Sequence, residues 1–351
     1  MREPRFWQAP RGGEVSLMPR LLAPAALLYG IAGRMRKRFA RSERAAVPII
    51  CIGNITVGGT GKTPLALTLA SRLVAQGEKL HFLSRGYGGR EKGPLRVDLE
   101  KHGAAEVGDE PLLLAAVAPT WISADRAEGA AAAVREGASL IMMDDGLQNP
   151  TLEKDFSILV VDAATGLGNG RLLPAGPLRE RMDDALSRVG AVVIIGRGHA
   201  ADRLAARARA RGIPAFRAIL RAAPAPELDG LPVLAFAGIG RPEKFYATLR
   251  ELHADIVATE DFPDHHAFTE REALNLLVRA RDLNATPVTT EKDLARLRDA
   301  PAGSARAQLR DAAKTISVRA LIDDFASFER LLHDQIRLAR QRAAKRAAQP
   351  V

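Results

Sequence analysis

The amino-acid sequence predicts an α/β protein built on a parallel β-sheet, followed by a second, smaller α/β domain. Short apolar runs rich in β-branched residues alternate with alanine-rich helical stretches, the pattern of a parallel sheet covered on both faces. The chain has 351 residues, of which 47% are hydrophobic and 26% charged, and it contains no repeat of fixed period. This length and composition predict about two globular domains and exclude wholesale disorder.

The elements of the first domain follow in chain order. A strand at 47–52 precedes a glycine cluster, and a helix is expected from Lys62 to Ala75. Further helical composition occurs at 126–136. The remaining strand candidates of this domain are 80–83, 140–143, 158–161 and 192–195.

A shift in composition separates the two domains. The stretch AAPAPELDG at 222–230 is typical of a linker. Strand candidates resume after it at 233–236, 286–290 and 316–320. We therefore expect an N-terminal segment, a first domain, a smaller α/β domain and a basic tail, at 1–46, 47–222, 230–334 and 335–351.

The net charge of +10 belongs to the two ends of the chain. Residues 1–46 carry a net charge of +7 and residues 335–351 carry +5, so the part between them is at −2. A nucleic-acid groove normally draws its cations from the folded body, so no nucleic-acid partner is expected. The single cysteine excludes an internal disulfide and a cysteine-based zinc site, and it favours a reducing compartment.

The N-terminal segment combines an apolar run with cations. Residues 21–33 are apolar, and Arg34, Arg36, Lys37 and Arg38 follow. Thirteen residues are fewer than the roughly 20 that a helix needs to span a bilayer, and a basic cluster stands where a signal peptide would be cleaved. The pattern favours a helix in the interface of an anionic membrane. The alternative is a helix buried against the body.

A phosphate-binding loop lies between the first strand and its helix. It reads TVGGTGKT, with threonine where the G-x-x-x-x-G-K-[ST] pattern begins with glycine. The glycines allow backbone N–H groups to face a phosphate, the lysine reaches the β- and γ-phosphates, and the last threonine ligates Mg²⁺. ATP and Mg²⁺ are therefore the expected cofactors of a P-loop NTPase-type domain. The predicted nucleotide-binding residues are Thr56, Val57, Gly58, Gly59, Thr60, Gly61, Lys62 and Thr63.

Acidic and histidine residues supply further candidates. Asp144 and Asp145 end a strand, where a P-loop protein holds Mg²⁺, although D-D-G is also turn chemistry. Asp109 or Glu110 could serve a helix N-terminus, or a carboxylate there could accept a proton from a hydroxyl. His265 and His266 lie on a turn before a helix, where histidine orients a base or merely forms a cap.

Two loops carry charged groups with glycine or proline. The first, SRGYGGR at 84–90, suits an anionic or sugar-bearing ligand. The second, RLLPAGPLRE at 171–180, ends in Arg179 and Glu180 and could bring this charged pair to the phosphate site. Either loop could instead be connecting structure.

Nine motifs together resemble the tetraacyldisaccharide 4′-kinase family of lipid A (lipopolysaccharide) biosynthesis. The resemblance extends over nearly the whole chain and is far more specific than a P-loop alone. In order, the motifs are the apolar-basic N-terminus, IGNITVGGTGKTP, LSRGYGG, VGDEP, DDGLQN, LLPAGPLRE, FAGIGRPEKF, FPDHHAF and TTEKDLARL.

The resemblance implies a phosphotransferase with an alcohol acceptor. It implies transfer of the γ-phosphate of ATP to the 4′-hydroxyl of a tetraacyldisaccharide 1-phosphate, with Mg²⁺, at the cytoplasmic face of the bacterial inner membrane. Asp109 is implied as the base, paired with His265 rather than His266, with Lys62 at the phosphates. The implied metal residues are Thr63, Asp144, Asp145 and Glu180, and the implied substrate contacts are Arg85 and Tyr87.

The sequence departs from the usual D-D-G-F-Q-H pattern of this family. Leu147 and Asn149 stand where Phe and His are common, so no role is carried over to Asn149. The alternative function is a membrane-recruited P-loop ATPase switch that acts on a protein partner. Such dimeric switches place a lysine directly before the glycine pair, where this chain has Val57, and a nucleic-acid ATPase is a more distant alternative.

Overall fold

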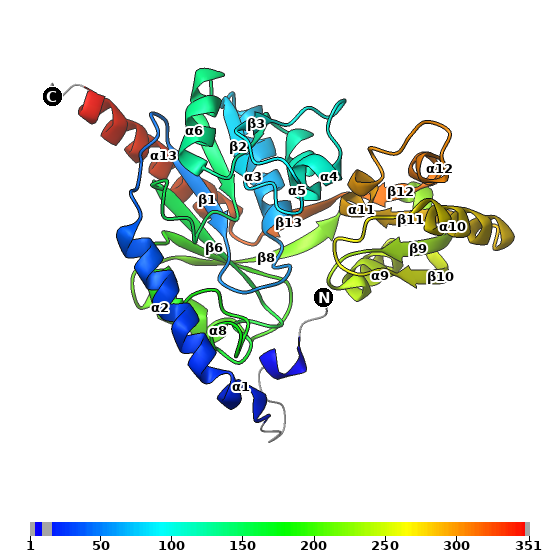
Figure 1. Ribbon diagram of the computed structural model, residues 1–351, viewed down its shortest axis with the longest axis horizontal. Coiled ribbons are helices and arrows are strands. Elements are labelled where there is room, and N and C mark those ends of the chain that lie inside the picture. The colour runs from blue at the N-terminus through cyan, green and yellow to red at the C-terminus, as the bar shows by residue number, and fades with distance from the viewer. Residues whose placement is uncertain (1–3, 9–15, 348–351) are drawn as a thin grey trace. The chain divides into compact units, whose positions relative to one another are not determined.

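The computed structural model describes residues 4–8 and 16–347, which form two compact units (Figure 1). The P-loop unit contains the described residues up to 85, residues 123–220 and residues 320–347. The second unit contains Gly86–Ile122 and Arg221–Arg319. Composition predicts one boundary near 222–230, whereas the second unit also takes a stretch from the first half of the chain. That stretch has the same mixed strand and helix character as its surroundings, so composition does not mark it.

The P-loop unit is built on a sheet with strand order β13-β8-β7-β6-β1-β5-β2. The central strand β1 (Ile49–Gly53) pairs in parallel with β5 and β6, with Ile50 opposite both Met142 and Phe156. All five residues of β1 are buried, as expected for a parallel sheet covered on both faces. The other strands are β2 (Leu80–Ser84), β5 (Leu140–Asp144), β6 (Phe156–Asp162), β7 (Ala191–Ile195), β8 (Ala215–Ala222) and β13 (Val318–Ile322).

Helix α3 (Lys62–Ala75) has the bounds expected from the sequence and buries Leu65, Leu69 and Leu73. Their four-residue spacing places the three leucines on one face of the helix, toward the sheet. The other helices of this unit are α6 (Arg126–Arg135), α7 (Met182–Leu186), α8 (Asp202–Arg209) and α13 (Phe325–Ala347), with a 3₁₀ turn at Arg5–Trp7. The expected basic tail is the C-terminal part of α13. Ile336 and Ala339 are buried on the inner face of this helix.

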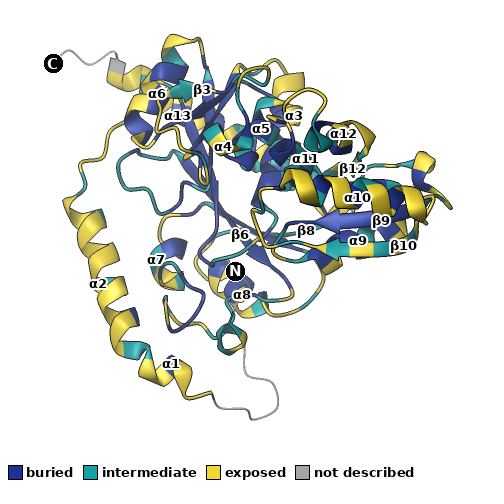
Figure 2. Cartoon of the chain, turned by 45° about the vertical axis from the view of Figure 1, so that its right-hand side comes forward, coloured by how far each residue is buried: buried dark blue, intermediate teal, exposed yellow. Residues whose placement is uncertain are grey.

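Helix α2 (Ala23–Phe39), with the short α1 (Met18–Leu21) before it, forms the N-terminal segment. Figure 2 shows α2 exposed along most of its length, and Ala26 is its one buried residue. In the described part of the chain, no helix combines the length and the apolar character needed to cross a bilayer. Residues 1–3 and 9–15 of the expected 1–46 segment, and 348–351 of the tail, lie outside the described residues.

The second unit contains a four-stranded parallel sheet with strand order β10-β9-β11-β12. Its strands are β9 (Pro232–Ala237), β10 (Asp255–Asp261), β11 (Thr286–Thr290) and β12 (Lys314–Ile316), and β3 (Leu95–Arg96) pairs antiparallel with β4 (Thr120–Ile122). The helices are α4 (Ala104–Val107), α5 (Asp109–Ala115), α9 (Pro242–Glu251), α10 (Glu270–Asp282), α11 (Glu291–Arg296) and α12 (Ala305–Ala312), with a 3₁₀ turn at Pro226–Leu228.

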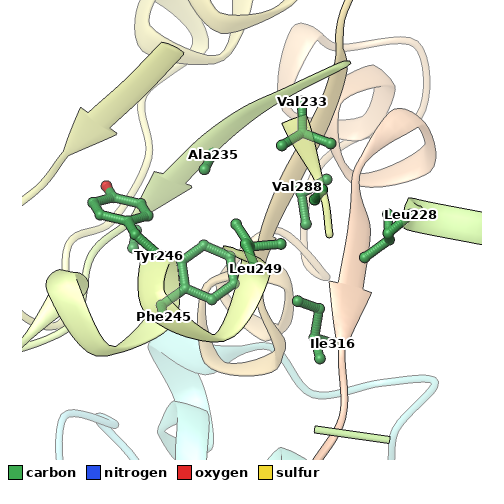
Figure 3. Close-up of a cluster of buried hydrophobic side chains, with 10 residues drawn as sticks. Leu228, Val233, Ala235, Phe245, Tyr246, Leu249, Val288 and Ile316 are labelled. Atoms are coloured by element: carbon green, nitrogen blue, oxygen red, sulfur yellow. The ribbon is translucent and has the colours of Figure 1, made fainter. Parts of the chain in front are cut away.

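One core of the second unit lies between the sheet and α9. Figure 3 shows Val233 and Val288 from two strands beside Phe245 and Leu249 from the helix. Leu228, from the expected linker, is buried in this cluster, so the stretch 222–230, whose other residues are exposed or half-buried, is anchored to the core of this unit by that side chain.

The strand expected at 316–320 is two strands. β12 ends at Ile316 and β13 begins at Val318, and each belongs to a different sheet. The backbone N–H of Ala223 donates to the carbonyl of Ser317, the residue between the two strands, at 2.8 Å. Apolar residues alternate with polar ones without interruption through Ile316, Val318 and Ala320, so periodicity does not reveal this break.

Candidate active site

The phosphate-binding loop has the backbone that its glycines permit. Gly58 and Gly61 have φ values of 98° and 86°, a region that residues with a side chain rarely adopt. A Cβ on Gly61 would also approach Ile195 Cδ1 to 3.0 Å. Lys62 and Thr63 follow in the first turn of α3, and both are buried. The loop therefore directs backbone N–H groups and a helix N-terminus toward the same point.

Lys62 is paired with the second aspartate of the DDG motif. Its Nζ lies 3.5 Å from Asp145 Oδ1, and Arg179 Nη1 donates to Asp145 Oδ2 at 2.8 Å. Burial alone would raise the pKa of Asp145, but the positive charges of Lys62 and Arg179 outweigh it and lower that pKa. The structure thus brings the expected loop of Arg179 to the P-loop lysine, and Asp145 lies between the two cations.

Glu180 is also surrounded by donors. One of its oxygens accepts from Gln148 Nε2 at 2.9 Å, and the other accepts from Lys37 Nζ at 2.5 Å and from Arg188. Lys37 belongs to α2, so a side chain of the N-terminal segment reaches a predicted metal residue. We did not expect this contact from sequence, since 143 residues separate the two groups.

Polar side chains in and just before the phosphate loop, and at the end of β5, are buried. Asp144 is buried at the end of β5, beside the strand that leads into the P-loop. Thr60 Oγ1 and both polar ends of the Asn54 side chain are buried with no hydrogen-bond partner within residues 4–8 and 16–347. Unsatisfied buried polar atoms are costly, so their presence is typical of a ligand site. The same residues contain no cluster of three or more His, Cys, Asp or Glu side chains that could hold a metal unaided.

Asp109 begins helix α5 in the second unit. Gly108 before it has a φ of 88°, and a Cβ there would meet the carbonyl oxygen of Tyr87 at 2.5 Å. Only glycine fits this turn, which separates α4 from α5 and directs the Asp109 side chain inward. The side chain is 4% exposed, and its Oδ1 accepts from the backbone N–H of Glu110 at 2.9 Å.

His265 contacts Asp109, as the resemblance implies. Its Nδ1 lies 3.1 Å from Asp109 Oδ2. An ionised carboxylate can only accept, so Nδ1 carries the proton and Nε2 is left as the acceptor nitrogen. The hydrogen bond to Asp109 raises the pKa of His265 against the opposing effect of burial. The ring is 39% exposed and makes an edge contact with Tyr87, with 5.9 Å between ring centroids.

His266 has a different environment from its neighbour. Its Nε2 lies 2.9 Å from Glu272 Oε2, and its ring stacks on Phe262 at 5.0 Å. Glu272 also accepts from the backbone N–H of Thr269 and so completes the capping box of α10. His266 therefore supports a helix end, whereas His265 contacts the acid.

Arg296 is a partner of Asp109 that the sequence did not single out. It is buried, and both Nε, at 3.0 Å, and Nη2 donate to Asp109 Oδ2. Burial alone would raise the pKa of Asp109, but the hydrogen bond from His265 and the charges of Arg296 and Lys292 hold it well below its usual range. Chain separation hides the contact, because Asp109 and Arg296 lie 187 residues apart.

The two residues expected to contact substrate lie in different units. Arg85 is exposed in the P-loop unit, and Tyr87 is exposed in the second unit. Arg126, at the start of α6, is a buried cation that sequence reasoning missed. Burial, together with the charge of Arg85, lowers the pKa of Arg126 to about 10. The one feature of the sequence that marks Arg126 is its place directly after Asp125, the N-cap of α6.

Comparison with known proteins identifies the family. A sequence model described as "Tetraacyldisaccharide-1-P 4'-kinase" matches residues 18–337. The chain belongs to this family. A relative named "Tetraacyldisaccharide 4'-kinase" from Parvibaculum lavamentivorans is 65% identical over 97% of this chain and all of its own length. One of the same name from Rhodospirillum centenum is 53% identical over 88% of this chain and 91% of its own.

A solved structure agrees with the fold. It is the crystal structure of the "apo" form of LpxK from Aquifex aeolicus in complex with ATP. Its TM-score is 0.69 at 26% identity, and the match covers 91% of this chain and 99% of that one. The α/β fold with a mostly parallel sheet, which the sequence predicts for this chain, is thereby confirmed.

Proposed function

We propose that this chain is an ATP-dependent tetraacyldisaccharide 4′-kinase of lipid A biosynthesis, which phosphorylates the 4′-hydroxyl of a tetraacyldisaccharide 1-phosphate. Family membership over residues 18–337 supports the activity and the use of ATP. The observation that carries the site assignment is the contact between the buried Asp109 and the half-exposed His265, in a chain that also has a P-loop with its lysine in place.

The reaction forms a bond between the 4′-oxygen and the γ-phosphorus and breaks the bond from that phosphorus to the β,γ-bridging oxygen, which releases ADP. The hydroxyl proton passes to the Asp109–His265 pair. Asp109 supplies the negative charge, and Nε2 of the half-exposed His265 takes no part in the bond to Asp109 and lies 3.9 Å from Asp264 Oδ1. We assign the proton to the pair, because two groups in direct contact titrate together. Lys62 and the loop N–H groups bind and orient the phosphates.

Magnesium completes the proposed nucleotide site. Mg²⁺, when bound, neutralises charge on the phosphates and so favours transfer. We assign Thr63 and Asp144 as the residues that hold it. Asp145 and Glu180 are engaged by basic side chains, and we propose that they position Lys62 and Arg179, and Lys37 and Arg188, around the phosphates.

The proposed location is the cytoplasmic face of an anionic inner membrane. Helix α2 exposes Leu28 and Phe39 at 68% and 74%, and cations occupy its last turn. Exposed apolar side chains beside cations are typical of helices that lie in a membrane interface. This surface would place the protein where an acylated acceptor is found.

Label transfer tests the function and the base together. The protein is incubated with γ-labelled ATP and tetraacyldisaccharide 1-phosphate in detergent micelles. Label in the lipid supports the kinase, whereas label only in free phosphate favours an ATPase switch and overturns the proposal. Asp109→Asn should lower kcat by about 10²–10⁴-fold, with ATP affinity close to wild type. His265→Ala should show a smaller loss in the same direction, and wild-type turnover in both variants contradicts the base assignment.

A further inference from the structure

Two of the sequence motifs have no role in the proposed reaction, yet they meet at one residue. Gly238, in FAGIG, donates its N–H to Asp293 Oδ1 at 3.1 Å. Its carbonyl accepts from Arg296 Nη1 at 2.7 Å, and both partners belong to TTEKDLARL. The same carbonyl accepts the backbone N–H of His265 at 3.1 Å. A Cβ on Gly238 would lie 2.9 Å from Asp293 Oδ1, so this approach requires glycine.

Arg296 joins this cluster to the proposed base. Nη1 donates to Asp293 Oδ1 at 2.6 Å, while Nε and Nη2 both donate to Asp109 Oδ2. Thr290 orients Asp293 from the other side, because its hydroxyl donates to Asp293 Oδ2 at 2.6 Å. The side chains of Arg296, Asp109 and Asp293 are each at most 5% exposed. A guanidinium suits this place because its planar donors serve two carboxylates and a carbonyl at once.

We propose that Arg296, oriented by Asp293, is the positioning residue of the Asp109–His265 base. It holds the Asp109 carboxylate in place as a charged acceptor for the Nδ1–H of His265. Through the Gly238 carbonyl it also fixes the backbone of His265, which has a φ of 59°. The inference rests on the proposed function, since it assigns a role in the same proton transfer.

The charges around Asp109 set the direction of the expected effect. Arg296 and Lys292 approach from α11, and His265 and Asp264 come from the loop after β10. Glu110, the next residue of α5, is paired with Lys292 at 2.6 Å. The positive charge of Arg296 opposes protonation of Asp109 and of His265 alike. Without this charge the pair takes up its proton at higher pH, so the enzyme stays inactive to a higher pH on its acid side.

The experiment measures kcat/KM for the lipid against pH in the full-length protein. Arg296→Met should lower the value at pH 7 by about 10–100-fold and move the acid limb up by about one to three pH units. Part of the loss is then recovered at high pH. Arg296→Lys keeps the charge but loses the fork of donors, so its acid limb should lie near that of wild type with a smaller loss. Asp293→Asn removes an acidic group and should lower kcat without an upward shift.

Two further measurements separate the possible failures. Urea unfolding and ATP binding show whether each variant is folded, and Arg296→Gln, which also removes the charge, serves if Arg296→Met is not. A fall in rate with an unchanged pH profile in the folded variant that lacks the charge overturns the inference, as does wild-type behaviour of that variant. Asp109→Asn is assayed alongside: if it keeps full turnover, the proposed base itself is wrong. If it loses turnover while the Arg296 variant that lacks the charge keeps the wild-type profile, only the role of Arg296 is wrong.

Discussion

At the scale of single residues, one carboxylate concentrates much of the chemistry of the second unit. Asp109 is buried, and its charge is stabilised by a guanidinium, an imidazole and a backbone N–H. A buried ion pair of this kind contributes little to stability compared with apolar packing, but removing one partner leaves the other uncompensated. The arrangement is therefore better explained by a need for a fixed, ionised acid than by a need for stability.

The low pKa of Asp109 predicts how stability changes in acid. Burial works against ionisation here, but His265, Arg296 and Lys292 outweigh it and hold the folded-state pKa below the ordinary value of about 3.9. As the pH falls, Asp109 is therefore protonated in the unfolded chain before it is protonated in the folded protein. Its contribution to the free energy of unfolding is complete near pH 7 and is lost as the pH falls below about 5. The excess free energy of unfolding of wild type over Asp109→Asn should shrink between pH 7 and pH 3.5 in urea titrations.

An exposed acid provides the control for that measurement. Asp183 pairs with Arg207 and Arg211 at the surface, where solvent screens the interaction. Asp183→Asn should show a much smaller pH-dependent difference. A difference between wild type and Asp109→Asn that is constant across the pH range would contradict the assigned cause.

At the scale of secondary structure, the two adjacent histidines serve different elements. His266 bonds to Glu272, which caps α10, while His265 bonds to Asp109. His266→Ala should lower the free energy of unfolding by about 1 kcal/mol, the usual value of a lost cap contact, and leave kcat within about twofold. His265→Ala should instead lower kcat and have the smaller effect on the free energy of unfolding. Thermal unfolding measures the stability of both variants, and the label-transfer assay measures their kcat. A large loss of kcat in His266→Ala would show that His266, and not His265, supports the base.

Sequence predicted the elements better than the contacts between them. Helix α3 was predicted to the residue, because a glycine loop and GKT fix where it begins. The adjacency of Asp109 and His265 followed from resemblance and not from periodicity. Arg296 could not be found in this way: its partner Asp109 is 187 residues away, and an arginine in a helix usually lies on a solvated face. The break at Ser317 was likewise hidden, because apolar and polar residues alternate without interruption across it.

At the scale of the whole chain, the structure shows which segments carry the excess positive charge of the sequence. Helix α2 contributes +4 to the net charge of +7 of residues 1–46, and its four cations lie at its C-terminal end, after a run of exposed apolar residues. The second unit is assembled from two stretches, so removing either stretch would remove part of the proposed base. Lys37 is one of the cations of α2, and it also forms an ion pair with Glu180. Deleting residues 1–46 would therefore remove this ion pair as well as the proposed membrane surface.

Point substitutions on α2 therefore test the membrane surface more cleanly than a truncation. Leu28→Glu with Phe39→Glu should reduce binding to phosphatidylglycerol vesicles by about tenfold or more, because each side chain loses an apolar transfer of about 1.5–3 kcal/mol. Lys37 stays in place, so turnover in detergent micelles should remain near wild type. Val74→Glu, at an exposed apolar position on α3, is the matched control and should bind as wild type does. Binding that falls with added salt identifies the contribution of the cations, and unchanged binding of the double variant would show that α2 does not contact the membrane.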